Sequence, residues 1–169
     1  MGERHERAEL NLSFSGPEGD YHVGHTRASD SRMLKRFKRG TTVRSARQMS
    51  IVSVEELVEV AEKLAIPEVR PEWLAANLVA SGIPDLTLLP PSTRLQFPSG
   101  ATIVIDIENL PCRYPAAVIG KHHPGADAAF IKEARGKRGV VGWIEAEGVV
   151  RLGDAITIWI PPQRIYAHT

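Results

Sequence analysis

The chain has 169 residues, of which 43% are hydrophobic and 24% charged, and its formal net charge is +1. These values are typical of a globular protein and exclude a mostly disordered chain, a collagen and a coiled coil. No run of 18 apolar residues is present, so we expect no membrane span. The N-terminal MGERHERAEL lacks the apolar core of a signal peptide, and the one cysteine excludes an internal disulfide. We therefore expect one domain over residues 1–169 in a reducing cytoplasm.

The first fifty residues predict strands separated by a glycine-rich loop. ELNLSFS (9–15) alternates apolar and polar residues, as a half-buried strand does. The following SGPEGDYHVGHTRASD is typical of a loop. MLKRFKRG (33–40) is compatible with one or two helical turns, and RQMSIV (47–52) predicts a short strand.

Two helices are expected next. Ser53 and Glu56 form an S-x-x-E capping pattern before apolar residues at helical spacing. A second helix is predicted to start near Pro71, to include Asn77 and to end at Gly82.

The second half of the chain predicts mainly strands. TRLQF (93–97) and ATIVIDIE (101–108) flank a Pro-Ser-Gly turn and indicate a hairpin. Further elements are expected as a helical turn in AAVIG (116–120), a helix over AAFIKEARGK (128–137) capped by Asp127, and strands in GVVGWIEAEG (139–148) and VVRLGDAITIWI (149–160). Strands at both ends with helices between them predict an α+β domain on one antiparallel sheet or barrel.

The near-neutral net charge hides two basic segments. From residue 27 to 47 the chain has one acid, Asp30, among the bases Arg27, Arg32, Lys35, Arg36, Lys38, Arg39, Arg44 and Arg47. From residue 113 to 138 the bases are Arg113, Lys121, Lys132, Arg135, Lys137 and Arg138. If the segments meet in space they form a site for an anion, whereas apart they are two solvated loops.

Cys112 is the first candidate for chemistry. It lies in NLPCRYP, after a predicted apolar strand and between prolines, and Arg113 places a cation beside the thiol. A cation favours the thiolate, which can bind a soft metal, carry a persulfide sulfur or attack an electrophile. The alternative is a buried cysteine that fills space.

The loop GDYHVGHTR offers further polar candidates. Asp20, His22, His25 and Arg27 together could hold an anion or transfer protons, or could form only a hydrogen-bonded loop. Histidine spacing matches no zinc pattern. Asn77 has apolar neighbours, so it must find buried partners or point into a ligand pocket.

These segments together resemble the MOSC domain, the molybdenum cofactor sulfurase C-terminal family. GDYHVGHTR resembles its G-D-x-H-x-G stretch, RPEWLAANLVASGI its segment ending in E-N-L, PCRYP its Pro-Cys, and GVVGWIEAEGVVRLGDAITI its closing strands. The resemblance runs from about residue 11 to 160. Ala76 stands where the family usually has Glu, and Asn109 where Arg is common three residues before the cysteine.

The resemblance implies a mainly β fold, a closed and mostly antiparallel β-barrel of the pyruvate-kinase-barrel type with peripheral helices. It implies that Cys112 is the catalytic residue, which carries sulfur or ligates molybdenum. For a molybdenum cofactor with an anionic phosphate, we expect the ligand to be held by polar and basic residues of the segments described above: Asp20, His22, His25, Arg27, Arg47, Asn77, Arg113, Lys121, Arg135 and Arg138. No pyridoxal phosphate site is expected.

Four functions follow as alternatives. The first is reduction of N-hydroxylated small molecules at molybdenum, with electrons from a separate protein. The second is a sulfur carrier with a persulfide on Cys112, supplied by a separate desulfurase for metallosulfur cofactor assembly. The third is a non-catalytic binding module. An RNA-binding barrel is the weakest because the net charge is near zero, so we expect neither a nucleic-acid nor a membrane partner.

Overall fold

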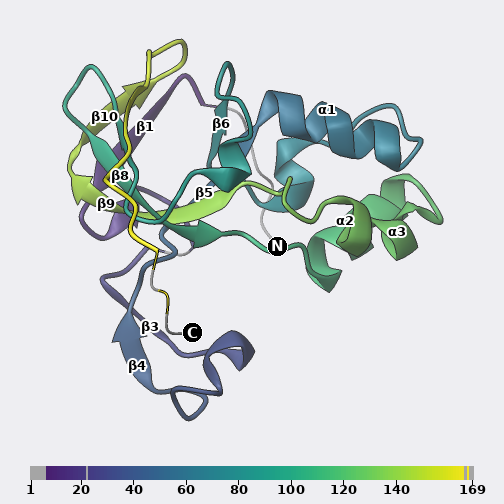
Figure 1. Cartoon of the computed structure of the whole chain (residues 1–169), viewed down its shortest axis with the longest axis horizontal. Coiled ribbons are helices and arrows are strands. Elements are labelled where there is room, and N and C mark those ends of the chain that lie inside the picture. The colour runs from purple at the N-terminus through teal and green to yellow at the C-terminus, as the bar shows by residue number, and fades with distance from the viewer. Residues whose placement is uncertain (1–6, 22, 166, 168–169) are drawn as a thin grey trace.

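The computed structural model describes residues 7–21, 23–165 and 167 and has a curled six-stranded sheet at its centre (Figure 1). The strand order is β11-β7-β8-β9-β5-β6, and all neighbours are antiparallel except β5 and β6. The bounds are β5 Met49–Ser53, β6 Leu78–Ala80, β7 Arg94–Gln96, β8 Thr102–Glu108, β9 Val140–Ala146 and β11 Thr157–Trp159. The predicted hairpin of β7 and β8 and the predicted strand β5 are confirmed.

Two smaller sheets accompany this one. β10 (Gly148–Arg151), β1 (Glu9–Ser13) and β2 (Gly16–Pro17) form a three-stranded sheet that packs against the curled sheet over a core including Leu12, Met49 and Ile103. β3 (Thr26–Ala28) and β4 (Thr42–Arg44) form a separate two-stranded ribbon. Between them lies a 3-10 turn, η1 (Ser31–Met33), in place of the helical turns expected over 33–40.

The expectation of a closed barrel is wrong, because the curled sheet keeps two free edges at β6 and β11. β6 has only three residues, and Gly82, two residues beyond its end, has the positive φ (+75°) of a turn. β1 pairs with β10 and β2 and not with β6. A groove of about 1110 Å³ lies between β6 on one side and β1 and β10 on the other. The fold is therefore a half-barrel, mainly β, with three α-helices in the part of the chain that the structure describes.

The helices cover one side of the sheet, on the right in Figure 1. α1 (Val54–Lys63), α2 (Arg113–His122) and α3 (Ala126–Glu133) enclose a second core with Phe130 at its centre. Ser53 caps α1 as predicted, since its Oγ accepts from the Glu56 backbone amide at 3.3 Å. No helix among the described residues is long and apolar enough to cross a membrane.

The predicted second helix does not form. Pro71 starts a 3-10 helix, η2 (Pro71–Leu74), which ends at Ala75 in the left-handed conformation (φ 59°). The chain then extends, and Asn77 immediately precedes β6. Ordinary helical backbone cannot continue through a left-handed residue, so Asn77 is placed by a strand register and not by a helix face.

Three smaller differences concern the second half of the chain. Gly125 is the residue before α3, and Asp127 lies inside its first turn without capping it. The predicted strand 149–160 is interrupted after Arg151, so β10 and β11 belong to different sheets. A short 3-10 helix, η3 (Leu86–Leu88), precedes β7.

Candidate functional site

Cys112 lies between β8 and α2, as the residue directly before the first turn of α2. Its backbone is extended (φ −147°, ψ 174°), and its thiol makes no capping hydrogen bond to the helix. The first turn of a helix has N–H groups without intrahelical partners and carries a partial positive charge, and both attract anions. Cys112 is half-buried beside the positive end of this helix.

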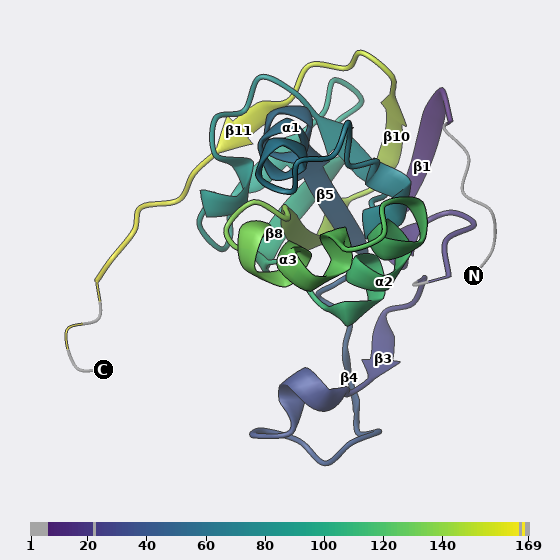
Figure 2. The ribbon, with the colours of Figure 1, turned by 90° about the vertical axis from the view of Figure 1, so that its right-hand side faces the viewer.

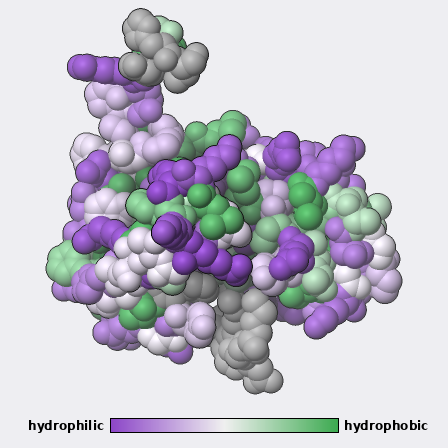
Figure 3. Space-filling view, turned by 90° about the horizontal axis from the view of Figure 1, so that it is seen from below, coloured by the Kyte–Doolittle hydropathy of each residue, from purple (hydrophilic) through white to green (hydrophobic). Residues whose placement is uncertain are grey.

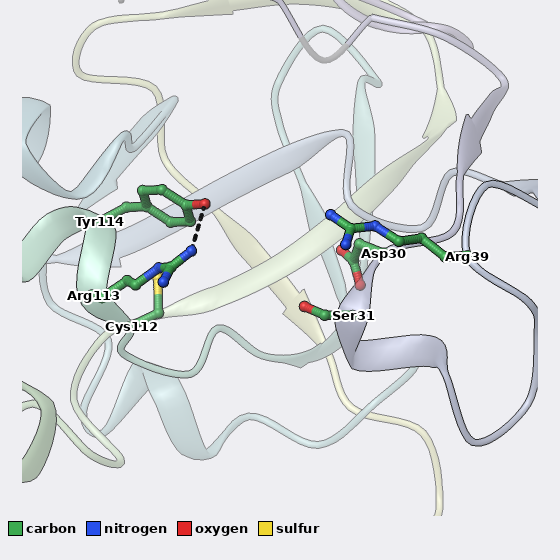
Figure 4. A pocket seen from close by; sticks show the side chains of 6 residues that line it. All are labelled: Asp30, Ser31, Arg39, Cys112, Arg113 and Tyr114. Atoms are coloured by element: carbon green, nitrogen blue, oxygen red, sulfur yellow. Dashed lines mark hydrogen bonds between the residues drawn. The ribbon is translucent and has the colours of Figure 1, made fainter.

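An open pocket of about 690 Å³ lies over Cys112 (Figure 4). Its body side consists of Cys112, Arg113 and Tyr114. The other side consists of Asp30, Ser31 and Arg39. These three belong to the segment from β3 to β4, residues 26–44, which we call the arm. Figure 2 shows the arm projecting from the body on the side of α2 and α3.

The pocket therefore brings the two basic segments of the sequence together, with Arg39 from the first and Arg113 from the second. Arg113 Nη2 donates a hydrogen bond to the Tyr114 hydroxyl at 3.4 Å, and its Cζ lies 5.2 Å from the centre of the Tyr114 ring. This hydrogen bond, together with the charges of Arg113 and Arg39, lowers the pKa of Tyr114. The Cys112 thiol, the guanidinium groups of Arg39 and Arg113, and the Tyr114 phenol with its lowered pKa thus surround one space.

The start of the Cys112 loop is tied to β5 by Asn109, which is only 6% exposed. Its backbone amide donates to the Gly139 carbonyl at 2.9 Å. Its side-chain Oδ1 accepts from Arg47 Nη2 at 2.8 Å, and its Nδ2 donates to Ser50 Oγ at 3.1 Å. Arg47, predicted as a cofactor ligand, thus holds the loop that presents Cys112.

Asn77 and Asp20 form a second polar connection on the other side of Ser50. Asn77 Nδ2 donates to Asp20 Oδ2 at 2.8 Å, while Asn77 Oδ1 accepts from the Ser50 backbone amide at 2.9 Å. Both residues line the large groove beside β6, whereas Cys112 lines the smaller pocket. The expectation that Asn77 is partly buried and finds polar partners is confirmed, and its contact with a cofactor stays a prediction.

The remaining predicted residues are spread over the molecule. Arg27 holds the arm together, since its Nη1 lies 3.2 Å from Asp30 Oδ2 and its Nη2 contacts Met33 Sδ at 3.4 Å. His25 is exposed at the base of the arm, where its carbonyl accepts from the Ser45 amide at 2.9 Å, and His22 lies outside the described residues.

The bases beyond Arg113 lie away from the first turn of α2. Lys121 is exposed in the last turn of α2, about 13 Å along the helix axis from Cys112. Arg135 is exposed just after α3. Arg138 is buried, and its Nη2 donates to the Leu74 carbonyl at 2.7 Å, so it links β9 to η2. Of the predicted cofactor ligands, only Arg113 lines the described Cys112 pocket.

Four residues of the pocket escaped the sequence-based assignment: Asp30, Ser31, Arg39 and Tyr114. Tyr114 could have been noticed because it follows Cys112-Arg113 directly. Arg39 belongs to the first basic segment, but nothing in the sequence separates it from its basic neighbours. Among the described residues, no group of three or more His, Cys, Asp or Glu side chains could hold a metal ion.

Comparison with known proteins identifies the family of this chain. The model of the MOSC domain matches residues 18–157. A Bacillus subtilis (strain 168) protein named "Putative metal-sulfur cluster biosynthesis proteins YuaD" is 42% identical over 153 residues, which span 89% of this chain and 79% of that protein. The crystal structure of the YUAD protein from Bacillus subtilis superposes with a TM-score of 0.86 at 41% identity, covering 90% of this chain and 85% of that one. YiiM from Escherichia coli shares the fold at 18% identity, with a TM-score of 0.62 and coverage of 93% and 65%. The chain belongs to the MOSC domain family.

Proposed function

We propose that this protein is a sulfur carrier that holds a persulfide on Cys112 for the assembly of metal–sulfur groups. The observation that carries the proposal is the position of Cys112 at the N-terminus of α2, in a pocket open to solvent and lined by Arg39 and Arg113. The name of the 42% identical Bacillus subtilis protein refers to metal-sulfur cluster biosynthesis, which supports the sulfur carrier over the other candidate functions.

The chemistry needs no reagent beyond a sulfur donor. The Cys112 thiolate attacks the outer sulfur of a donor persulfide, R–S–SH, and a sulfur–sulfur bond to Cys112 forms as the bond to the donor sulfur breaks. The donor leaves as the thiolate R–S⁻, and Cys112 becomes the persulfide, so the donor and Cys112 together neither gain nor lose electrons. The N-terminus of α2 and Arg113 would attract an anionic sulfur donor to this pocket.

The test uses the fact that Cys112 is the only cysteine of the chain. Anaerobic incubation with cysteine persulfide should add one sulfur atom to the intact protein, measured by mass spectrometry, and added thiol should remove it. Cys112→Ser should gain none and should keep the thermal unfolding midpoint of the parent. If the parent accepts sulfur only after denaturation, Cys112 is a packing residue and the binding-module alternative takes precedence.

Molybdenum-cofactor binding is the second candidate, and the donor set of the pocket favours it. A thiolate suits a soft metal, and two arginines on the same pocket suit the phosphate of a pterin. Cys112 would hold the metal, Arg39 and Arg113 would hold the phosphate, and the bound group would supply two-electron chemistry on an N-hydroxylated substrate. Metal analysis of anaerobically purified protein separates the two candidates, because stoichiometric molybdenum would displace the sulfur carrier.

A further inference from the structure

The arm is a folded element and not a loose loop. The buried Ser29 hydroxyl donates to the Lys38 carbonyl at 2.6 Å, and the Ser29 amide donates to the Thr41 carbonyl at 2.8 Å. Arg27 and Asp30, both half-buried, form an ion pair at 3.2 Å within it. These bonds fix the shape of a ribbon that forms a sheet of its own and stands beside the Cys112 pocket (Figure 2).

The outer surface of the arm combines positive charge with exposed apolar side chains. Its exposed bases are Lys35, Arg36, Lys38, Arg39 and Arg44. Its one acid, Asp30, is engaged by Arg27. Leu34 and Phe37 are 57% and 40% exposed between these bases. Figure 3, which looks at the molecule from below, shows hydrophilic and hydrophobic side chains side by side on the face from which the arm projects.

The body continues this surface on the opposite side of the pocket. Leu110 and Tyr114 are 53% and 64% exposed next to Cys112. A partner that rests on the arm and on these residues therefore covers Cys112. Apolar anchors inside a charged rim are typical of protein–protein contacts, and the charge of the rim selects a partner of opposite sign.

A second copy of this chain fits the arm poorly. Its acids gather in residues 55–72, but several of them serve the fold. Glu56 is buried and accepts from the Thr87 hydroxyl at 2.7 Å, Glu59 pairs with Lys137 at 3.1 Å, and Glu72 pairs with Arg70 at 3.4 Å. A nucleic acid is also disfavoured, because Phe37 is the only aromatic residue in the arm and Arg36 lies over its ring at 6.0 Å.

We infer that the arm is the docking surface for an acidic, cysteine-bearing loop of the protein that delivers sulfur to Cys112. The inference rests on the proposed function. A loop of Asp and Glu residues with one exposed apolar residue would contact the bases of the arm and Leu34, and its persulfide would enter the pocket. The Cys112 thiolate would then take the outer sulfur, and the donor cysteine would leave as a thiolate.

The test compares three persulfides as sulfur donors: cysteine persulfide, an acidic peptide with one cysteine persulfide, and the same peptide with Gln and Asn in place of Glu and Asp. At about 0.01 M salt, where the Debye length is about 30 Å, the acidic peptide should react at least about tenfold faster than the neutral peptide. At about 1 M salt, with a Debye length of about 3 Å, this advantage should disappear.

Two pairs of charge reversals locate the effect. K35E/K38E changes exposed arm residues that do not line the pocket, and it should abolish the advantage of the acidic peptide while leaving the rate with cysteine persulfide unchanged. The matched control K63E/K132E makes the same change of net charge at the exposed ends of α1 and α3, and it should keep the advantage. The milder K35Q/K38Q should fall between the parent and K35E/K38E.

Each outcome bears on one of the two proposals. Failure of cysteine persulfide to modify the folded parent overturns the sulfur-carrier function. Transfer from cysteine persulfide with equal rates for both peptides, or equal losses in the arm and control pairs, overturns the docking surface alone. Displacement of the acidic peptide by a single-stranded RNA that binds the arm more tightly at about 0.15 M salt also overturns it, in favour of a nucleic-acid partner.

Discussion

Replacing Asn109 by alanine should lower the free energy of unfolding by about 2–4.5 kcal/mol. The substitution removes the 2.8 Å hydrogen bond from Arg47, which is worth about 1.5–3 kcal/mol because one partner is charged, and the 3.1 Å bond to Ser50, worth about 0.5–1.5 kcal/mol. The backbone bond to Gly139 remains. The loop before Cys112 should therefore loosen while the fold persists.

Urea denaturation with an unchanged slope measures the loss, and the rate of thiol labelling of Cys112 reports on the loop. N109A should label faster than the parent. The near-isosteric Asn109→Asp is the matched control. Its carboxylate keeps the acceptor for Arg47, and the Ser50 hydroxyl can turn to donate to the carboxylate. N109D should lose less than half as much stability as N109A. A change within about 0.5 kcal/mol for N109A would show that this network does not hold the loop.

Two further predictions concern the fold around the site. Gly139→Ala should lower the free energy of unfolding by several kcal/mol more than Gly153→Ala does, as measured by chemical denaturation. Both glycines have similar φ (+82° and +85°), but a Cβ at 139 meets the Ile51 carbonyl oxygen whereas a Cβ at 153 meets nothing within 4 Å. Equal losses of stability in the two variants would contradict the close approach of the Ile51 carbonyl to residue 139. Burial raises the pKa of Asp106 more than nearby Arg47, Arg36 and Arg27 lower it, so the folded state binds its proton more tightly than the unfolded state does. The stability of the parent relative to Asp106→Asn should then rise as pH falls through the folded-state pKa and level off below the unfolded value of 3.8, and a pH-independent difference would contradict this.

Much of the element order follows from local patterns. Alternation predicts β1, the segment RQMSIV predicts β5, the Pro-Ser-Gly turn predicts the β7–β8 hairpin, and the Ser53 capping pattern predicts α1. Each of these signals depends on residues close in sequence, which is why they survive without tertiary information. The prediction of a second helix was wrong because Ala75 adopts the left-handed conformation, and an alanine gives no local sequence signal for that conformation.

The open edge of the half-barrel depends on contacts that a local pattern does not contain. β6 pairs with β5 in parallel for three residues, and the chain then leaves the sheet. Whether the sheet closes into a barrel or leaves a groove beside β6 therefore depends on where the pair of β1 and β10 packs against the rest of the fold. The resemblance to a family predicted strands in the right places and also predicted a closure that this chain does not have.

The sequence by itself determined the one thiol, its neighbouring cation and the two basic segments, because these are properties of residue types and their spacing. Only the tertiary structure decided which bases meet Cys112. The fold places Arg39 across the pocket from Arg113, pairs Arg27 with Asp30 and Arg47 with Asn109, and buries Arg138 against Leu74. Arginines of the same sequence segment thus have different roles. The role of a guanidinium group depends on the groups that it contacts, and these contacts are set by packing between residues far apart in the sequence.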